Sequence, residues 1–77
     1  MFVETIYATI RNITKSINPG EGYAIDLNNA QGASFVAYIS KKERCKYSIG
    51  DIVELHIHEE LIEDDAMFYE KIGKKVG

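Results

Sequence analysis

Two histidines stand two positions apart at His56 and His58, and carboxylates follow them closely. Residues two apart on a strand point to the same face, with Cα atoms about 7 Å apart. Imidazoles at that spacing, with Glu59, Glu60 or Asp64 beside them, could supply ligands to a metal ion. No third ligand stands at a spacing typical of a metal site. The sequence therefore predicts two exposed strand histidines beside carboxylates, and neither a metal nor another cofactor.

The single cysteine, Cys45, could act as a nucleophile if a histidine lay beside it as a base. No sequence signature of a catalytic cysteine surrounds it, and the lysine-rich segment around it is typical of a solvated surface. We therefore predict that the chain is not an enzyme. A lone cysteine cannot form an internal disulfide, which favours a reducing compartment, and so we expect a cytoplasmic location.

Carboxylates are concentrated in residues 59–65, where charge alone could attract Mg²⁺ or Ca²⁺. The segment lacks the D-x-[DN]-x-[DN]-G pattern of an EF-hand loop. Charge runs of this kind are usually solvated loops, and we expect such a loop here.

One basic cluster resembles a segment that contacts phosphates. Cations beside aromatic rings suit the binding of single-stranded nucleic acid, by charge and by stacking. The alternative is a solvated helical turn without a ligand. The candidate nucleic-acid-binding residues are Lys41, Lys42, Arg44 and Lys46, flanked by Tyr38 and Tyr47.

Alternation of apolar and polar residues predicts the elements that position these side chains. The expected strands cover residues 2–13, 23–28, 33–40, 52–58 and 66–72. Turns are expected at 18–22, which contains the only proline, and at 28–32. Residues 41–47 break the alternation and predict a helical turn capped by Ser40. The side chains expected to face inward include Ile6, Ala8, Ile10, Ile25, Leu27, Phe35, Ala37, Ile39, Val53, Leu55 and Ile57, and Tyr7, Tyr23 and Tyr69 are expected in the core or wall.

Five strands with a helical insertion between the third and fourth predict an all-β fold, a five-stranded Greek-key barrel of the OB type. An SH3-like barrel is the main alternative. Seventy-seven residues make one domain, which we expect to comprise a barrel over residues 1–72 and a flexible basic tail over 73–77. The apolar runs are far shorter than the roughly 20 residues of a membrane helix, and so no membrane partner is expected.

Charge is distributed unevenly along the chain. Residues 1–50 carry six basic and four acidic side chains, whereas residues 51–77 carry three basic and eight acidic ones, and the net charge is −3. Nonspecific DNA-coating proteins usually need a net basic surface. Binding of nucleic acid by this chain should therefore be local, weak, shared among several copies or selective for shape.

Two segments carry a family resemblance. The stretch from Gly50 to His58 (GDIVELHIH) and that from Glu63 to Tyr69 (EDDAMFY) are similar to the N-terminal domain of the RuvA family, which recognises Holliday junctions. The stretch GASFVAYI at 32–39 is compatible with the same family. The chain departs from the family pattern at Glu63, where the family has arginine, and its fourth-strand histidine is out of register by about one residue. The 77 residues also hold no counterpart of the family's helix–hairpin–helix and C-terminal domains.

The resemblance implies an OB-type barrel that acts on branched or single-stranded DNA within a homo-oligomer or a larger protein assembly. It implies an acidic pin at Asp64 and Asp65, which would repel phosphates and favour strand separation. Expected roles therefore lie in DNA recombination, repair or replication. Two other functions stay open. One is a protein–protein adaptor without affinity for nucleic acid, and the other is an RNA-binding barrel like those of S1 domains and initiation factors.

Overall fold

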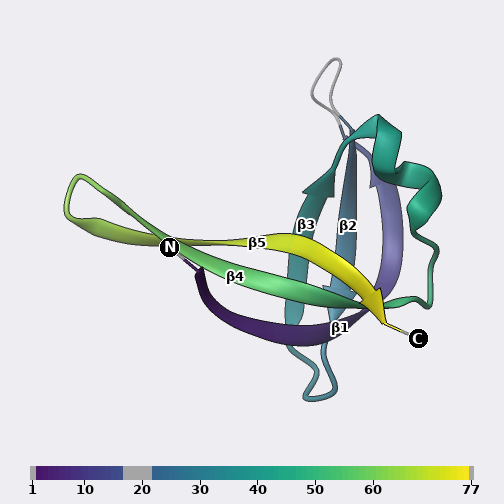
Figure 1. The fold of residues 1–77 in the computed structure, drawn as a ribbon, viewed down its shortest axis with the longest axis horizontal. Coiled ribbons are helices and arrows are strands. Elements are labelled where there is room, and N and C mark those ends of the chain that lie inside the picture. The colour runs from purple at the N-terminus through teal and green to yellow at the C-terminus, as the bar shows by residue number, and fades with distance from the viewer. Residues whose placement is uncertain (1, 17–21, 77) are drawn as a thin grey trace.

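The computed structural model describes residues 2–16 and 22–76, which form five strands and one short helix. The strands are β1 (Phe2–Lys15), β2 (Tyr23–Asn28), β3 (Ser34–Ile39), β4 (Ile52–Ile62) and β5 (Asp65–Val76), and the 3-10 helix η1 (Lys41–Lys46) lies between β3 and β4. All five strands form one antiparallel sheet in the order β3-β2-β1-β4-β5 (Figure 1). The predicted all-β fold with a helical insertion is confirmed at this level. Among the described residues, no helix is long and apolar enough to cross a membrane.

The two halves of strand β1 pair with different strands. Residues 2–9 pair with β4, residues 9–15 pair with β2, and the register shifts between Ile10 and Asn12. A bulge of this kind bends a strand and increases its twist. The sheet curls until its edge strands β3 and β5 approach each other, and the Tyr47 hydroxyl donates a hydrogen bond of 3.5 Å to the Gly73 carbonyl of β5. The sheet is not closed, because no strand pairing joins β3 to β5 in the described chain.

The core lies inside this curled sheet and follows the predicted alternation. Five of its side chains are almost completely inaccessible, and burying one such aliphatic chain is worth about 1.5–3 kcal/mol. The other four buried residues are smaller or slightly more accessible. The buried residues are Ala8, Ile10, Ile25, Leu27, Ala37, Ile39, Tyr47, Val53 and Leu55.

The turn between β2 and β3 forms as its sequence predicts. Asn29 Oδ1 accepts hydrogen bonds from the backbone amides of Gln31 (3.0 Å) and Ala33 (2.9 Å). Gly32 adopts a φ of +87°, which glycine reaches without steric cost. The predicted turn at 18–22 lies almost entirely outside the described residues, which resume at Gly22.

The connection expected at 59–65 is wrong. Strand β4 continues to Ile62, β5 begins at Asp65, and only Glu63 and Asp64 form the turn. These two residues have φ values of +49° and +70°, as a tight type I′ hairpin requires at both central positions. Alternation does not predict these strand residues, because Glu59 and Glu60 are both acidic and Leu61 and Ile62 are both apolar. A hairpin with both faces in solvent needs no alternation of polar and apolar residues.

The expected end of the last strand at residue 72 is also wrong, because β5 continues to Val76. Val76 and Lys75 pair with Ile52 and Val53 at the start of β4. Lys75 Nζ lies 3.5 Å from Asp51 Oδ2, which also ties this segment to the turn before β4. The expected boundary between barrel and basic tail therefore falls inside a strand.

Candidate nucleic-acid interface

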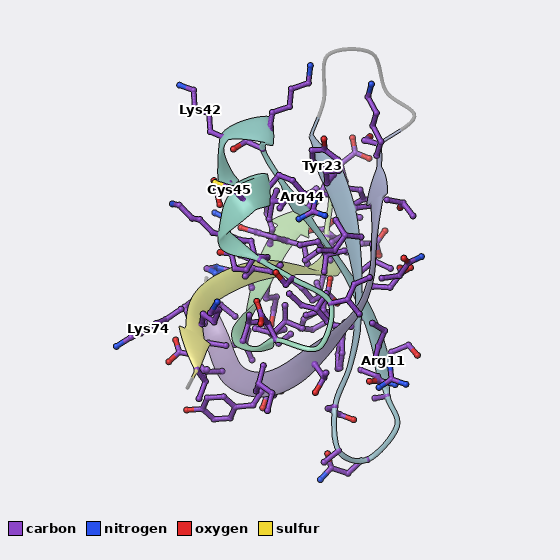
Figure 2. All side chains as sticks on the ribbon, turned by 90° about the vertical axis from the view of Figure 1, so that its right-hand side faces the viewer. Arg11, Tyr23, Lys42, Arg44, Cys45 and Lys74 are labelled. Carbon is purple, nitrogen blue, oxygen red and sulfur yellow. The ribbon has the colours of Figure 1, made fainter. Side chains whose placement is uncertain are left out.

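Helix η1 carries the basic cluster and exposes three lysines, Lys41, Lys42 and Lys46. Figure 2 shows Lys42 extending away from the body of the protein. Ser40 is the residue before the helix, as predicted, but its hydroxyl does not cap the helix backbone. It donates instead to Glu43 Oε1 at 3.3 Å. The three lysines therefore present a local positive charge at one end of the molecule.

Arg44, the fourth basic residue of the cluster, makes contacts within the chain. Its Nη1 donates a 3.0 Å hydrogen bond to the Tyr47 carbonyl, and its guanidinium carbon lies 5.6 Å from the centre of the Tyr23 ring (Figure 2). Such a cation–π contact is worth about 0.5–1 kcal/mol at an exposed site. Arg44 therefore attaches η1 to β2, whereas the lysines extend into solvent.

The two tyrosines that flank the cluster have opposite surroundings. Tyr38 is 71% exposed at the end of β3, whereas Tyr47 is only 7% exposed and belongs to the core. Burial raises the pKa of the Tyr47 hydroxyl, and the nearby Glu43 charge raises it further. Of these two tyrosines, Tyr38 is therefore the one that offers a ring face on which a base could stack.

Two of the tyrosines expected in the core or wall lie on strands of the sheet but outside the core. Tyr7 and Tyr69 are 58% and 36% accessible. Tyr7 pairs across strands with Glu54 and Tyr69 pairs with His58, which places both on the outer face of the sheet. Tyr23 is half-buried and packs against the core, as expected.

The outer face of β2 and β3 adjoins Tyr38. On this face the exposed Val36 lies opposite Asp26, and Tyr38 lies opposite Ala24. A hollow of about 580 Å³ adjoins the face and extends to β1 and β5. Its lining combines the basic Arg11 with the acidic Asp26 and Glu70, and is therefore not basic overall. The lining residues are Arg11, Asp26, Leu27, Asn28, Ser34, Phe35, Val36 and Glu70.

The acidic residues predicted as a pin lie at the far end of the β4–β5 hairpin. Asp64 is in the turn and Asp65 begins β5, and the hairpin extends well past the rest of the sheet (Figure 1). Helix η1 lies at the opposite side of the molecule in the same view. The structure therefore keeps the basic cluster and the acidic pair apart within one copy of the chain.

The projecting part of this hairpin, residues 59–68, is called the arm here, and its apolar surface was not predicted from the sequence. Leu61 is 72% exposed and Phe68 is 58% exposed, and Ile62 and Met67 are exposed at 46% and 53%. The length of the hairpin explains this exposure. In the described part of β1 the pairing with β4 ends at His58, so the arm extends beyond this pairing.

The two histidines lie on β4, and each contacts another side chain of the sheet. His56 Nε2 lies 3.1 Å from Glu54 Oε1. The His58 ring stacks on Tyr69 at 5.2 Å between centroids. Desolvation lowers the pKa of His58, and the positive charge of Lys71 lowers it further. Within residues 2–16 and 22–76, no three His, Cys, Asp or Glu side chains are grouped as a metal site requires.

Comparisons with known proteins return no match of this chain to a protein-family model, a curated protein or a solved structure. Conclusions about function therefore depend on the geometry described above.

Proposed function

We propose that this chain is a non-enzymatic nucleic-acid-binding module of the OB type, which handles DNA as part of an assembly. The order of its strands supports this proposal. A five-stranded OB barrel opened between its third and fifth strands would have the order β3-β2-β1-β4-β5, which is the order seen here. The close approach of β3 to β5 and the position of η1 between β3 and β4 agree with the same topology.

The observation that carries the proposal is an exposed ring that lies a few residues before exposed cations in the chain. OB folds bind oligonucleotides on the face of strands 2 and 3. On that face Tyr38 is 71% exposed, and the three lysines of η1 follow it in the chain after Ser40. Stacking of one base on an aromatic ring is worth about 1–3 kcal/mol, and the lysines would contact phosphates. Arg44 would hold the lysine-bearing helix in place.

The net charge of −3 makes this a weak binder. Contacts between three lysines and single-stranded DNA would give a slope of about −2 in log affinity against log salt. We therefore expect dissociation constants in the micromolar range at low salt and little binding at physiological salt from one copy. An assembly of several copies would add the contributions of its members.

Asp64 and Asp65 fit the role of strand-separating residues in such an assembly. Carboxylates that face a phosphate backbone raise its local electrostatic energy. Within one copy they lie at the opposite side from η1, so they would not weaken the attraction of phosphates to the lysines. Copies arranged with their arms toward a common centre would bring the acidic tips to a junction. This is the arrangement that the resemblance to the RuvA N-terminal domain implies.

Fluorescence anisotropy with single-stranded, duplex and four-way-junction DNA at two salt concentrations tests the proposal. The triple variant Lys41→Ala, Lys42→Ala, Lys46→Ala should lose at least tenfold in affinity, and Tyr38→Ala should affect single strands most. Lys74→Ala is the matched control, because Lys74 is an exposed lysine on β5 away from η1 (Figure 2). Asp64→Asn with Asp65→Asn should reduce any preference for the junction. Absence of binding to all three DNAs at low salt would refute the proposal.

A protein–protein adaptor is the second candidate, and the exposed apolar residues of the arm favour it. An interface of that kind depends on apolar burial and would be far less sensitive to salt than phosphate binding. RNA and DNA of one sequence, compared in the same assay, test whether the module belongs with RNA-binding barrels instead.

A further inference from the structure

We propose that the arm is a docking site for an extended basic segment of another protein, which adds to the outer edge of β5 as a further strand. Its residues would alternate between apolar and lysine or arginine side chains. This inference does not depend on nucleic-acid binding by η1, because it rests on residues at the other side of the molecule.

Each face of the arm presents a diagonal pair of apolar side chains. Leu61 pairs with Ala66 and Glu59 pairs with Phe68, which places Leu61 and Phe68 on one face. In the same way Ile62 and Met67 share the other face, because they lie opposite Asp65 and Glu60. Exposed apolar residues gathered in one place usually mark an interaction surface.

The outer edge of β5 is available to a strand. Strand β5 is the last strand of the sheet, with β4 as its partner over the whole arm. An added strand would pair with the backbone of Asp65–Tyr69, and its side chains would meet the two faces alternately. One side chain would then reach the edge of the Leu61–Phe68 pair and the next would reach Met67.

The negative charge of the arm determines which kind of segment can bind along the outer edge of β5. The arm carries five carboxylates, at Glu59, Glu60, Glu63, Asp64 and Asp65, and no lysine or arginine stands between Lys46 and Lys71. Pairing with the arm of a second copy would bring like charges together, and like charges placed opposite each other across strands are destabilising. Nucleic acid would be repelled for the same reason. A basic segment is attracted to the site, and the carboxylates therefore discriminate as well as bind.

The arm is small by the standard of stable interfaces, which bury about 800 Å² per partner. We therefore expect a transient complex with a dissociation constant on the order of 10–100 µM for a short segment. Its affinity should fall with salt, because four of its five carboxylates, those other than Glu59, are exposed.

The test is NMR titration of the ¹⁵N-labelled full chain with a short blocked peptide that alternates lysine and valine. A peptide that alternates glutamate and valine is the control. The lysine peptide should shift the amide signals of residues 65–69, and the glutamate peptide should not. The variant Glu60→Lys with Asp65→Lys changes two exposed side chains on one face of the arm. It should bind the lysine peptide at least tenfold more weakly.

Two further variants separate the alternatives. Leu61→Ser with Phe68→Ser should also weaken binding of the lysine peptide, whereas the triple lysine-to-alanine variant of η1 should bind it normally. Equal binding of both peptides, signal shifts outside residues 59–69, or no binding by the wild type would overturn the proposal. Sedimentation of the wild type and of the Leu61→Ser, Phe68→Ser variant should give the same oligomeric state. A dimer that disappears in the Leu61→Ser, Phe68→Ser variant would also overturn it and assign the arm to a second copy.

Discussion

Replacing Arg44 with alanine tests whether this residue of η1 contributes to the stability of the protein rather than to the binding of nucleic acid. The substitution removes the hydrogen bond to the Tyr47 carbonyl and the contact with the Tyr23 ring. A hydrogen bond to a charged group contributes about 1.5–3 kcal/mol, and the half-exposed position of Arg44 lowers that to about 1 kcal/mol. Adding about 0.5 kcal/mol for the ring contact gives a loss of about 1.5 kcal/mol in the free energy of unfolding.

This loss should be visible in a thermal melt. For a domain of this size 1 kcal/mol corresponds to about 4–8 °C in Tm, so we expect Arg44→Ala to lower the Tm by about 6–12 °C. Lys41→Ala is the matched control, since it removes an exposed cation from the same helix. It should change the free energy of unfolding by less than about 0.5 kcal/mol. Circular dichroism is a suitable measurement, because the chain has no tryptophan.

The affinity for DNA should depend on the lysines of η1 rather than on Arg44. Arg44→Ala, measured well below its Tm, should retain most of the wild-type affinity for single-stranded DNA, whereas the triple lysine variant should lose it with little change in Tm. The reasoning is refuted if Arg44→Ala leaves the Tm unchanged and weakens DNA binding as much as the lysine substitutions do. The guanidinium would then be free to bind phosphate in solution.

Two other predictions concern a pair of glycines and a histidine. A Cβ at Gly22 would overlap the Ile39 carbonyl oxygen, so Gly22→Ala should cost about 3 kcal/mol or more. Gly32 has open space around it but a φ of +87°, so Gly32→Ala should lower the free energy of unfolding by about 1–2 kcal/mol. Urea unfolding measures both variants, and a larger loss for Gly32→Ala than for Gly22→Ala would contradict the prediction. Because the pKa of His58 is lowered, first by desolvation and then by Lys71, the unfolded chain binds more protons just below pH 6.5. The free energy of unfolding should therefore fall as the pH drops through 6.5, until the folded-state pKa is passed. His58→Gln should reduce this slope, and identical slopes for the two proteins would argue against the prediction.

The inner part of the sheet was predictable because it is buried on one side only. Ile25, Leu27 and Ala37 alternate with neighbours that are less buried, and each is buried as expected. The arm was not predictable, since neither of its faces is covered and alternation carries no information there. Its two-residue turn has no glycine or asparagine to mark it, and Glu63 and Asp64 adopt positive φ values in their place.

The basic cluster was only partly predictable for a different reason. The sequence places Tyr38 and Tyr47 on either side of the lysines, and local spacing treats them alike. What distinguishes them is the rest of the fold, because Tyr47 reaches Gly73 on β5, which is distant in sequence. The internal contact of Arg44 with Tyr23 likewise joins two elements whose proximity only the folded sheet establishes.

The division of β1 between two partners has a consequence for how the protein folds. The β2–β3 and β4–β5 hairpins each join neighbouring segments of the chain, so each can form by local search. Strand β1 must find β4, for instance Ala8 beside Val53, across a long stretch of sequence. Contacts between such distant segments slow folding. Of the described residues of β1, Thr9 alone pairs with both β2 and β4. The β2–β3 and β4–β5 hairpins can therefore form in either order, and the step that joins them is the docking of both hairpins onto β1.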